Sequence, residues 1–163
     1  MPSPKYIHLR LHSEYSIVDG IVRLEDAIGK AVADQMGALA ITDLMNLFGF
    51  IKFYSKARSA GIKPIAGADV WISNSEQTNK PFRALLLVKN TRGYLNLCEL
   101  LSKATIENQN LGRPEIHPSW FDMNSTSTLA QQEPFQLSEG LILLSGAIPV
   151  SYTHLTLPTI YSV

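Results

Sequence analysis

The feature that most restricts the fold of this chain is a regular alternation of strand-like and helix-like segments. A nearly all-apolar run at residues 38–42, typical of a strand covered on both faces, lies between two segments with helical spacing of apolar residues, 24–36 and 50–60. Later segments continue this alternation at a spacing of roughly thirty residues, the length of a strand–helix–strand unit. Such units join parallel strands by right-handed crossovers. The alternation therefore predicts an α/β fold with a mainly parallel sheet.

A first strand is predicted at residues 6–13, where aliphatic residues alternate with His8, Arg10 and His12. This period of two is typical of a strand with one apolar face and one polar face. Three further strands are predicted at residues 64–72, with an interruption at Gly67, at residues 83–89 and at residues 141–144.

Glycines and polar residues mark the expected ends of the helices. Gly37 and Gly61 follow the first two helical segments, as glycine does at many helix C-termini. Thr91 precedes a third helical segment, residues 93–105, and is predicted to cap it. Residues 124–139 are rich in Ser, Thr and Gln and are expected to form a surface loop.

The length and composition of the chain restrict its size and class. With 163 residues it is long enough for one ordinary domain, whereas a closed (β/α) barrel needs about 250 residues. A barrel would therefore be present only in part, and a small open α/β sheet is the alternative. A net charge of zero argues against a strongly basic nucleic-acid-binding module. The single cysteine excludes a disulfide framework and a zinc site with several thiolates.

No apolar run reaches the roughly 18 residues of a membrane span, and no apolar signal core follows the N-terminus. We therefore expect a cytoplasmic protein with no membrane partner.

Titratable side chains follow or lie on several of the predicted strands, and we expect them to share one cleft at the rim of the sheet. In α/β folds, functional groups gather beyond the C-terminal ends of the strands. The candidate site residues are His8, Arg10, His12, Asp19, Asp43, Asp69 and Arg83. Histidine and carboxylate ligands suit zinc, manganese or iron, and two such ions could activate water against a phosphate ester.

Other features of the same residues argue against a metal. Arg10 lies between His8 and His12, and a guanidinium repels a metal ion and pairs with a carboxylate instead. We expect that carboxylate to be Asp69 or Asp43. Asp43 is equally suited to an Asx turn or a helix cap, because Asn46 follows it closely.

Five ordered sequence blocks resemble one known family. The blocks are residues 6–20 (YIHLRLHSEYSIVDG), 38–49 (ALAITDLMNLFG), 61–69 (GIKPIAGAD), 85–97 (LLLVKNTRGYLNL) and 139–146 (EGLILLSG). In order and spacing they are similar to the PHP (polymerase and histidinol phosphatase) domain that opens bacterial replicative DNA polymerase III alpha subunits. The resemblance covers about residues 5–147, and five ordered blocks are more specific than any single motif.

The resemblance implies the first part of a distorted (β/α)7 barrel. It also implies that the polymerase active site, with its Mg²⁺, and the regions that contact DNA and the sliding clamp lie outside this chain. The expected domain organisation is a partial PHP domain at residues 1–148. Residues 149–163 lose the family pattern, and we expect a non-native or irregular tail there. We also expect the chain alone to be aggregation-prone or marginally stable, because the strand at residues 141–144 would lack its neighbours.

Metal-binding members of the family carry a His-x-His pair, an Asp in the next loop, a Thr-Asp-His triplet, a Glu after the third strand and a His on the fourth. This sequence keeps His12, Asp19 and Asp43 at matching positions. It departs from the pattern at four positions, which hold Arg10, Leu44, Asp69 and Arg83. The resemblance therefore implies a degenerate pocket with no metal and no catalytic residue.

Three functions follow from the resemblance. The first is a structural platform that docks the proofreading exonuclease subunit of the replicase. The second is a metal-dependent phosphoesterase, acting as a phosphatase, pyrophosphatase or exonuclease. The third is a free-standing enzyme similar to histidinol phosphatase. Arg10, Leu44 and Arg83 argue against the second, and the blocks at residues 61–69 and 93–97 favour the polymerase branch over the third.

Overall fold

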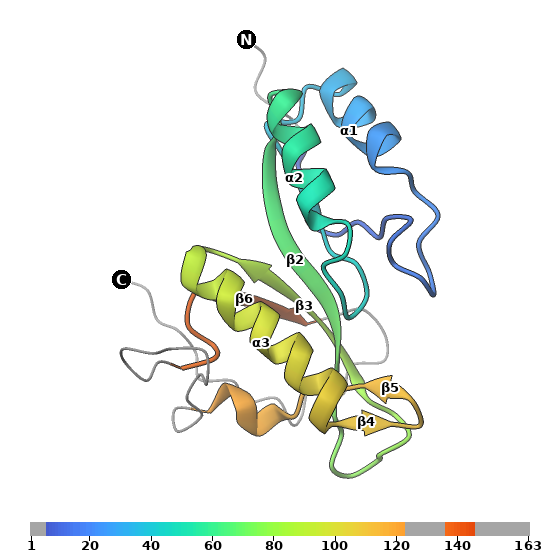
Figure 1. Cartoon of the computed structure of the whole chain (residues 1–163), viewed down its shortest axis with the longest axis vertical. Coiled ribbons are helices and arrows are strands. Elements are labelled where there is room, and N and C mark those ends of the chain that lie inside the picture. The colour runs from blue at the N-terminus through green and yellow to red at the C-terminus, as the bar shows by residue number, and fades with distance from the viewer. Residues whose placement is uncertain (1–5, 123–135, 146–163) are drawn as a thin grey trace.

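The computed structural model describes residues 6–122 and 136–145, and it shows an α/β fold built along one long strand (Figure 1). The α/β class is thus confirmed. Its helices and strands are α1 (Leu24–Ala33), β1 (Ala38–Ile41), α2 (Phe50–Ser59), β2 (Lys63–Ile72), β3 (Phe82–Val88), α3 (Thr91–Glu107), β4 (Gln109–Asn110), β5 (Arg113–Pro114) and β6 (Leu141–Ser145). A short 3₁₀ helix spans Pro118–Phe121.

Strand β2 is the spine of the molecule and changes partner along its length. Its first four residues pair in parallel with β1, and the residues from Gly67 onward pair antiparallel with β3. The predicted interruption at Gly67 is wrong, because the strand continues through it. A Cβ at Gly67 would lie 2.6 Å from the carbonyl oxygen of Leu86. Glycine is therefore needed where β3 begins to pack against β2.

The main sheet has the order β1-β2-β3-β6 and is mixed, which corrects the mainly parallel sheet that we predicted. Among the described strand pairs of the main sheet, β1–β2 alone is parallel, whereas β2–β3 and β3–β6 are antiparallel. Residues 73–81 connect β2 to β3 directly. A parallel neighbour needs a crossover of a dozen or more residues, and this connection is too short for one.

The prediction of a first strand at residues 6–13 is wrong, because residues 6–12 do not form a regular β-strand. This segment still runs beside β1. The amide of Ala40 donates to the carbonyl of His8 at 3.0 Å, and the amide of Thr42 donates to the carbonyl of Leu11 at 2.8 Å. The Thr42 hydroxyl accepts from the Leu11 amide at 2.9 Å. A threonine side chain thus supplies a bond that a regular ladder would supply.

Two predicted helix boundaries need correction. Helix α1 ends at Ala33, before Gly37, and Gln35 takes the left-handed conformation there with φ of 56°. Helix α3 is capped by Asn90, whose side chain accepts from the amide of Gly93 at 2.9 Å, and not by Thr91. By contrast, Gly61 ends α2 with φ of +77°, as the sequence predicted.

Strand β6 pairs with β3 over its whole length, which contradicts our expectation that it needs further neighbours to pair. The turn before it is anchored on α3. Asn96 donates to the carbonyls of Gln136 and Glu139 at 2.9 and 2.8 Å. Gly93 lies so close to Gly140 that a Cβ on Gly93 would be 1.8 Å from the Gly140 carbonyl oxygen.

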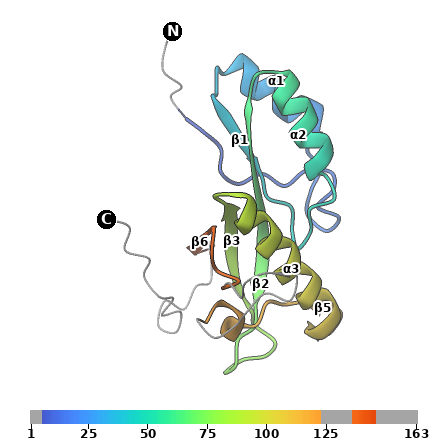
Figure 2. The ribbon, with the colours of Figure 1, turned by 60° about the vertical axis from the view of Figure 1, so that its left-hand side comes forward.

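Two apolar cores lie at the two ends of β2 (Figures 1 and 2). The first packs α1 and α2 against β1, with Phe53 fully buried at its centre. The second packs α3 against β2, β3 and β6, with Leu86, Leu97 and Leu100 fully buried.

The proposed domain boundary at residue 148, the irregular tail at residues 149–163 and most of the predicted polar loop lie outside the described residues.

Candidate functional site

The carboxylate of Asp69 is the centre of the candidate site. Asp69 lies on β2, and its side chain is only 1% exposed. Its Oδ2 accepts from Nε of Arg10 at 2.8 Å and also from a terminal nitrogen of the same guanidinium. The sequence left Asp69 and Asp43 as possible partners of Arg10, and the structure shows that Arg10 pairs with Asp69.

The imidazole of His12 joins two carboxylates. Its Nε2 is 2.9 Å from Oδ2 of Asp69, and its Nδ1 is 2.9 Å from Oδ1 of Asp19. A carboxylate oxygen only accepts when ionised, so both contacts are hydrogen bonds when both ring nitrogens carry a proton. The geometry suits a protonated His12 that links the loop of residues 13–22 to the sheet.

Arg83, on β3, completes the cluster from the other side of Asp69. It donates to Oδ2 of Asp19 at 3.0 Å, and its Nε lies 3.1 Å from Oδ1 of Asp69. The second contact is an ion pair without the alignment of a hydrogen bond. The guanidinium also lies over the ring of Trp71, 4.9 Å from its centroid. We call Arg10, His12, Asp19, Asp69 and Arg83 the ion network.

Asp43 lies beside the ion network but makes its hydrogen bonds elsewhere. Its two oxygens accept from the amide and the hydroxyl of Ser13, at 2.6 and 2.9 Å. These bonds hold the start of the loop of residues 13–22. These contacts are not those of the predicted Asx turn or helix cap, because both oxygens of Asp43 bond Ser13, 30 positions away in the sequence.

His8 lies apart from the network. It is exposed, and its ring meets the ring of Tyr6 edge-on with centroids 4.6 Å apart. The structure therefore brings together five of the predicted site residues, places Asp43 next to them and leaves His8 at the surface.

The charges of the network shift the pKa values of its members. The hydrogen bond to Asp69, helped by Asp19, raises the pKa of His12 despite the opposing effect of burial. Burial works against ionised Asp69, but the hydrogen bonds with His12 and Arg10 and the ion pair with Arg83 hold its pKa below the usual range. Burial also opposes ionised Asp19, whose pKa is lowered by hydrogen bonds from Ser16 and Arg83.

Asp43 behaves in the opposite way. Burial raises the pKa of Asp43, and the two bonds from Ser13 offset only part of this effect. Among the described residues no guanidinium pairs with Asp43, whereas two pair with Asp69.

The donor set does not fit the metal that the family pattern implies. Both nitrogens of His12 are bonded to carboxylates, and guanidinium groups occupy Asp69 and Asp19. Within residues 6–122 and 136–145, no three His, Cys, Asp or Glu side chains are arranged to hold a metal ion. The cations that neutralise these carboxylates belong to the protein itself.

Two contributors to the site were missed in the sequence. Ser16 donates to Asp19 at 2.6 Å and accepts from the amide of Leu44 at 2.9 Å, so it ties two loops together. Ser13 bonds Asp43. A serine in a loop belongs to no motif with a recognisable spacing. Only the position of Ser16, three residues before Asp19, could have indicated its role.

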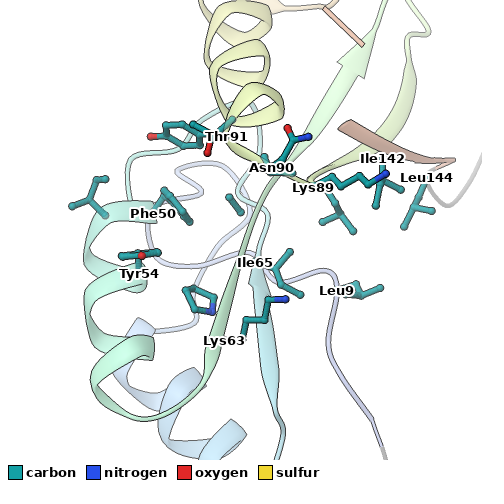
Figure 3. Close-up of a pocket in the computed structure, with 16 residues that line it drawn as sticks. Leu9, Phe50, Tyr54, Lys63, Ile65, Lys89, Asn90, Thr91, Ile142 and Leu144 are labelled. Atoms are coloured by element: carbon teal, nitrogen blue, oxygen red, sulfur yellow. The ribbon is translucent and has the colours of Figure 1, made fainter. Parts of the chain in front are cut away.

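A separate groove of about 740 Å³ lies beside the sheet (Figure 3). Its walls are mainly apolar, from Leu9, Phe50, Ile65, Ile142 and Leu144. None of the predicted site residues lines it, and none of its lining side chains is a carboxylate, histidine or cysteine. The groove is therefore distinct from the ion network, and the titratable side chains that line it are the lysines and tyrosines Tyr54, Lys63, Lys89 and Tyr94.

Comparison with known proteins identifies the relatives of this chain. Residues 8–160 match the PHP domain family. The chain is 47% identical over 148 residues to DNA polymerase III subunit alpha of Neisseria meningitidis and 40% identical over 146 residues to that of Escherichia coli. Both matches cover 90% of this chain, but it spans only 12% of the length of each relative.

Among solved structures, an amidohydrolase from Chromobacterium violaceum aligns with 61% of this chain and 33% of its own, with a TM-score of 0.48 and 23% identity. In the part of the chain that the structure describes, no helix is both long enough and apolar enough to cross a membrane.

Proposed function

Because this chain belongs to the PHP domain family, and matches that portion of DNA polymerase III alpha subunits, we propose that it is a structural platform without a catalytic metal. In this proposal the domain docks the proofreading exonuclease subunit of the replicase. The parent protein is a cytoplasmic DNA-directed DNA polymerase, a nucleotidyltransferase that uses Mg²⁺. Its contacts with DNA and the sliding clamp belong to regions outside this chain.

One observation carries the proposal: two arginines neutralise the carboxylates that a metal would otherwise bind. Arg10 and Arg83 contact Asp69 from two sides, and Arg83 also contacts Asp19. A divalent cation would have to displace both guanidiniums, and His12 would have to lose a ring proton that bonds a carboxylate before its nitrogen could act as a ligand. Without a metal-activated water, the phosphoesterase chemistry of the alternative function has no nucleophile at this site.

The metal-free half of the proposal is tested by metal content and affinity. We expect the purified chain, and the complete PHP domain of its parent protein, to contain no stoichiometric zinc or manganese by plasma mass spectrometry. Stoichiometric metal that is lost in His12→Ala would overturn this and favour the phosphoesterase.

The converse experiment restores the family ligands. The quadruple variant Arg10→His, Leu44→His, Asp69→Glu and Arg83→His should gain affinity for zinc in calorimetric titrations. A matched control carries Arg58→His, on the exposed side of α2, and should gain none.

The docking half is tested by titrating the chain with the exonuclease subunit from the same organism. Saturable binding at a ratio of one to one supports the platform. Absence of binding by the complete PHP domain would overturn it.

A further inference from the structure

The groove beside the sheet has an apolar lining that is partly exposed (Figure 3). Leu9, Ile142 and Leu144 are 42%, 45% and 39% exposed, whereas Leu87 is buried. Strand pairing fixes part of this lining, because Leu87 and Ile142 are partners across β3 and β6. The volume of about 740 Å³ lies within the range of about 300–1,000 Å³ that is typical of small-molecule sites. Apolar side chains gathered in a groove of this size are typical of a ligand site.

The charged side chains that line the groove are both positive. Lys63 and Lys89 line it, and among the described residues no aspartate or glutamate does. Figure 3 shows both lysines on the same side of β2 as Leu9, Ile65 and Ile142. No carboxylate in the described part of the chain forms an ion pair with either ammonium group. The groove therefore offers uncompensated positive charge beside an apolar surface.

The remaining polar side chains of the lining are neutral. They belong to Tyr54, Asn90, Thr91 and Tyr94. Their hydroxyl and amide groups can donate hydrogen bonds to an anionic group. The ring of Phe50 lies 6.0 Å from that of Tyr54 and 5.6 Å from that of Tyr94, measured between centroids. These rings extend the apolar lining toward α2.

The backbone that carries the two lysines is held in place by hydrogen bonds. The amide of Lys63 donates to the carbonyl of Gly37 at 3.0 Å, and the amide of Lys89 donates to the carbonyl of Gly140 at 2.9 Å. Because this backbone is ordered without a ligand, binding needs to order only the lysine side chains and the ligand itself.

We propose that the groove binds a small amphiphilic anion, a molecule with an apolar body and one carboxylate or similar anionic group. The apolar body would cover Ile65, Leu87 and Ile142, and the anionic group would meet the ammonium groups of Lys63 and Lys89. Charge complementarity selects this class, because both ammonium groups repel a cation and an uncharged apolar molecule leaves them without a partner. The proposal is independent of the platform function, since the groove and the ion network share no residue.

The test is calorimetric titration of the chain with dodecanoate below the concentration at which it forms micelles. We expect saturable binding at a ratio of one to one, and much weaker binding of dodecyltrimethylammonium, which has the same chain length and the opposite charge. Lys63→Gln with Lys89→Gln should bind dodecanoate at least about five-fold more weakly. The matched control, Lys30→Gln with Lys80→Gln, removes the same charge from exposed positions outside the groove and should bind normally.

A second variant tests the apolar wall. Ile142→Ser with Leu144→Ser removes two partly exposed side chains from β6 and should weaken dodecanoate binding at least about ten-fold. Unchanged unfolding midpoints would show that the variants fold.

Three outcomes would overturn the proposal. Equal affinity for dodecanoate and dodecyltrimethylammonium would show adsorption to apolar surface without recognition of charge. Wild-type affinity in the double lysine variant would place the anion elsewhere. Binding by this chain but not by the full-length parent protein would show that another part of that protein covers the groove. Each of these results leaves the platform function standing.

Discussion

The two ends of β2 are stabilised by different means. Toward the N-terminus the sheet is parallel, its outermost segment is irregular, and side chains of the ion network fasten that segment to β2 and β3. Toward the C-terminus three strands pair antiparallel, and α3 covers them with a continuous apolar core. Where backbone pairing is regular, apolar packing suffices. Where pairing is sparse, buried charges take over the positioning of the chain.

The difference also bears on how residues 8–12 are held in place. Residues 8–12 make only two backbone hydrogen bonds to the sheet through Ala40 and Thr42. Their position depends on what neutralises Asp69. Arg10 and Arg83 both bring positive charge to that carboxylate.

The largest expected effect comes from removing the central charge of the ion network, Asp69 on β2. Asp69→Asn leaves the guanidiniums of Arg10 and Arg83 and the imidazole of His12 without their shared partner. Because Asp69 is buried, we expect a loss of about 3–5 kcal/mol in the free energy of unfolding. Urea denaturation followed by circular dichroism measures it. The control Asp34→Asn removes an exposed carboxylate and should change little; a loss below about 1 kcal/mol for Asp69→Asn would contradict the role of the network.

A pair of glycine substitutions compares packing in the two regions. Gly93→Ala should destabilise by about 1–3 kcal/mol, because its methyl group meets the backbone of Gly140 and pushes the turn before β6 off α3. Gly29→Ala, in α1 with no atom within 4 Å of the new methyl, should stabilise by about 0.5–1 kcal/mol. Thermal unfolding of both variants measures the contrast. Equal effects would show that the β6 turn is not held as tightly as the contacts indicate.

The ion network predicts a pH dependence of stability. The pKa of His12 is raised from 6.5, so its contribution is complete below that value and is lost as the pH rises through the folded-state pKa. The pKa values of Asp19 and Asp69 are lowered from 3.8, so their contribution is present above it and is lost as the pH falls through the folded-state values. Asp43 has a raised pKa, so its protonation at low pH favours the folded state and partly offsets the stability lost from Asp19 and Asp69.

We therefore expect the free energy of unfolding to be highest between about pH 4 and 6.5 and to fall toward pH 8. Urea titrations across this range measure it. In the variant His12→Gln, the free energy of unfolding should fall less steeply between about pH 6.5 and 8. An unchanged slope in that variant would assign the pH dependence to other groups.

The smallest effect concerns an exposed ion pair in the same region. Lys30 and Asp34 are one helical turn apart, with Nζ to Oδ1 at 2.9 Å, and the lysine side chain is 74% exposed. Lys30→Ala should change the free energy of unfolding by at most about 0.5 kcal/mol. A larger loss would show that surface pairs, and not only the buried network, stabilise the N-terminal region.

Several elements could be predicted because their signal is local. The all-apolar run of β1 and the stripe of α2, ended by Gly61, are written in consecutive residues. The first strand was predicted wrongly at residues 6–12 because alternation of polar and apolar residues does not by itself specify backbone pairing, and here Ile7 and Leu9 are 38% and 42% exposed. The side chains of Arg10 and His12 both bond Asp69. Two side chains can point to the same carboxylate in this way without a regular ladder of backbone hydrogen bonds.

The sequence by itself determined the α/β class, the family, and the presence of arginines at family metal positions. These follow from residue identity and short-range spacing. Only the tertiary structure decided that Arg10 selects Asp69 over Asp43, that β3 runs antiparallel to β2, and that Ser16 ties two loops together. The physical reason is that pairing of charges and strands depends on distances across the fold, such as the 59 positions between Arg10 and Asp69, which local spacing does not encode.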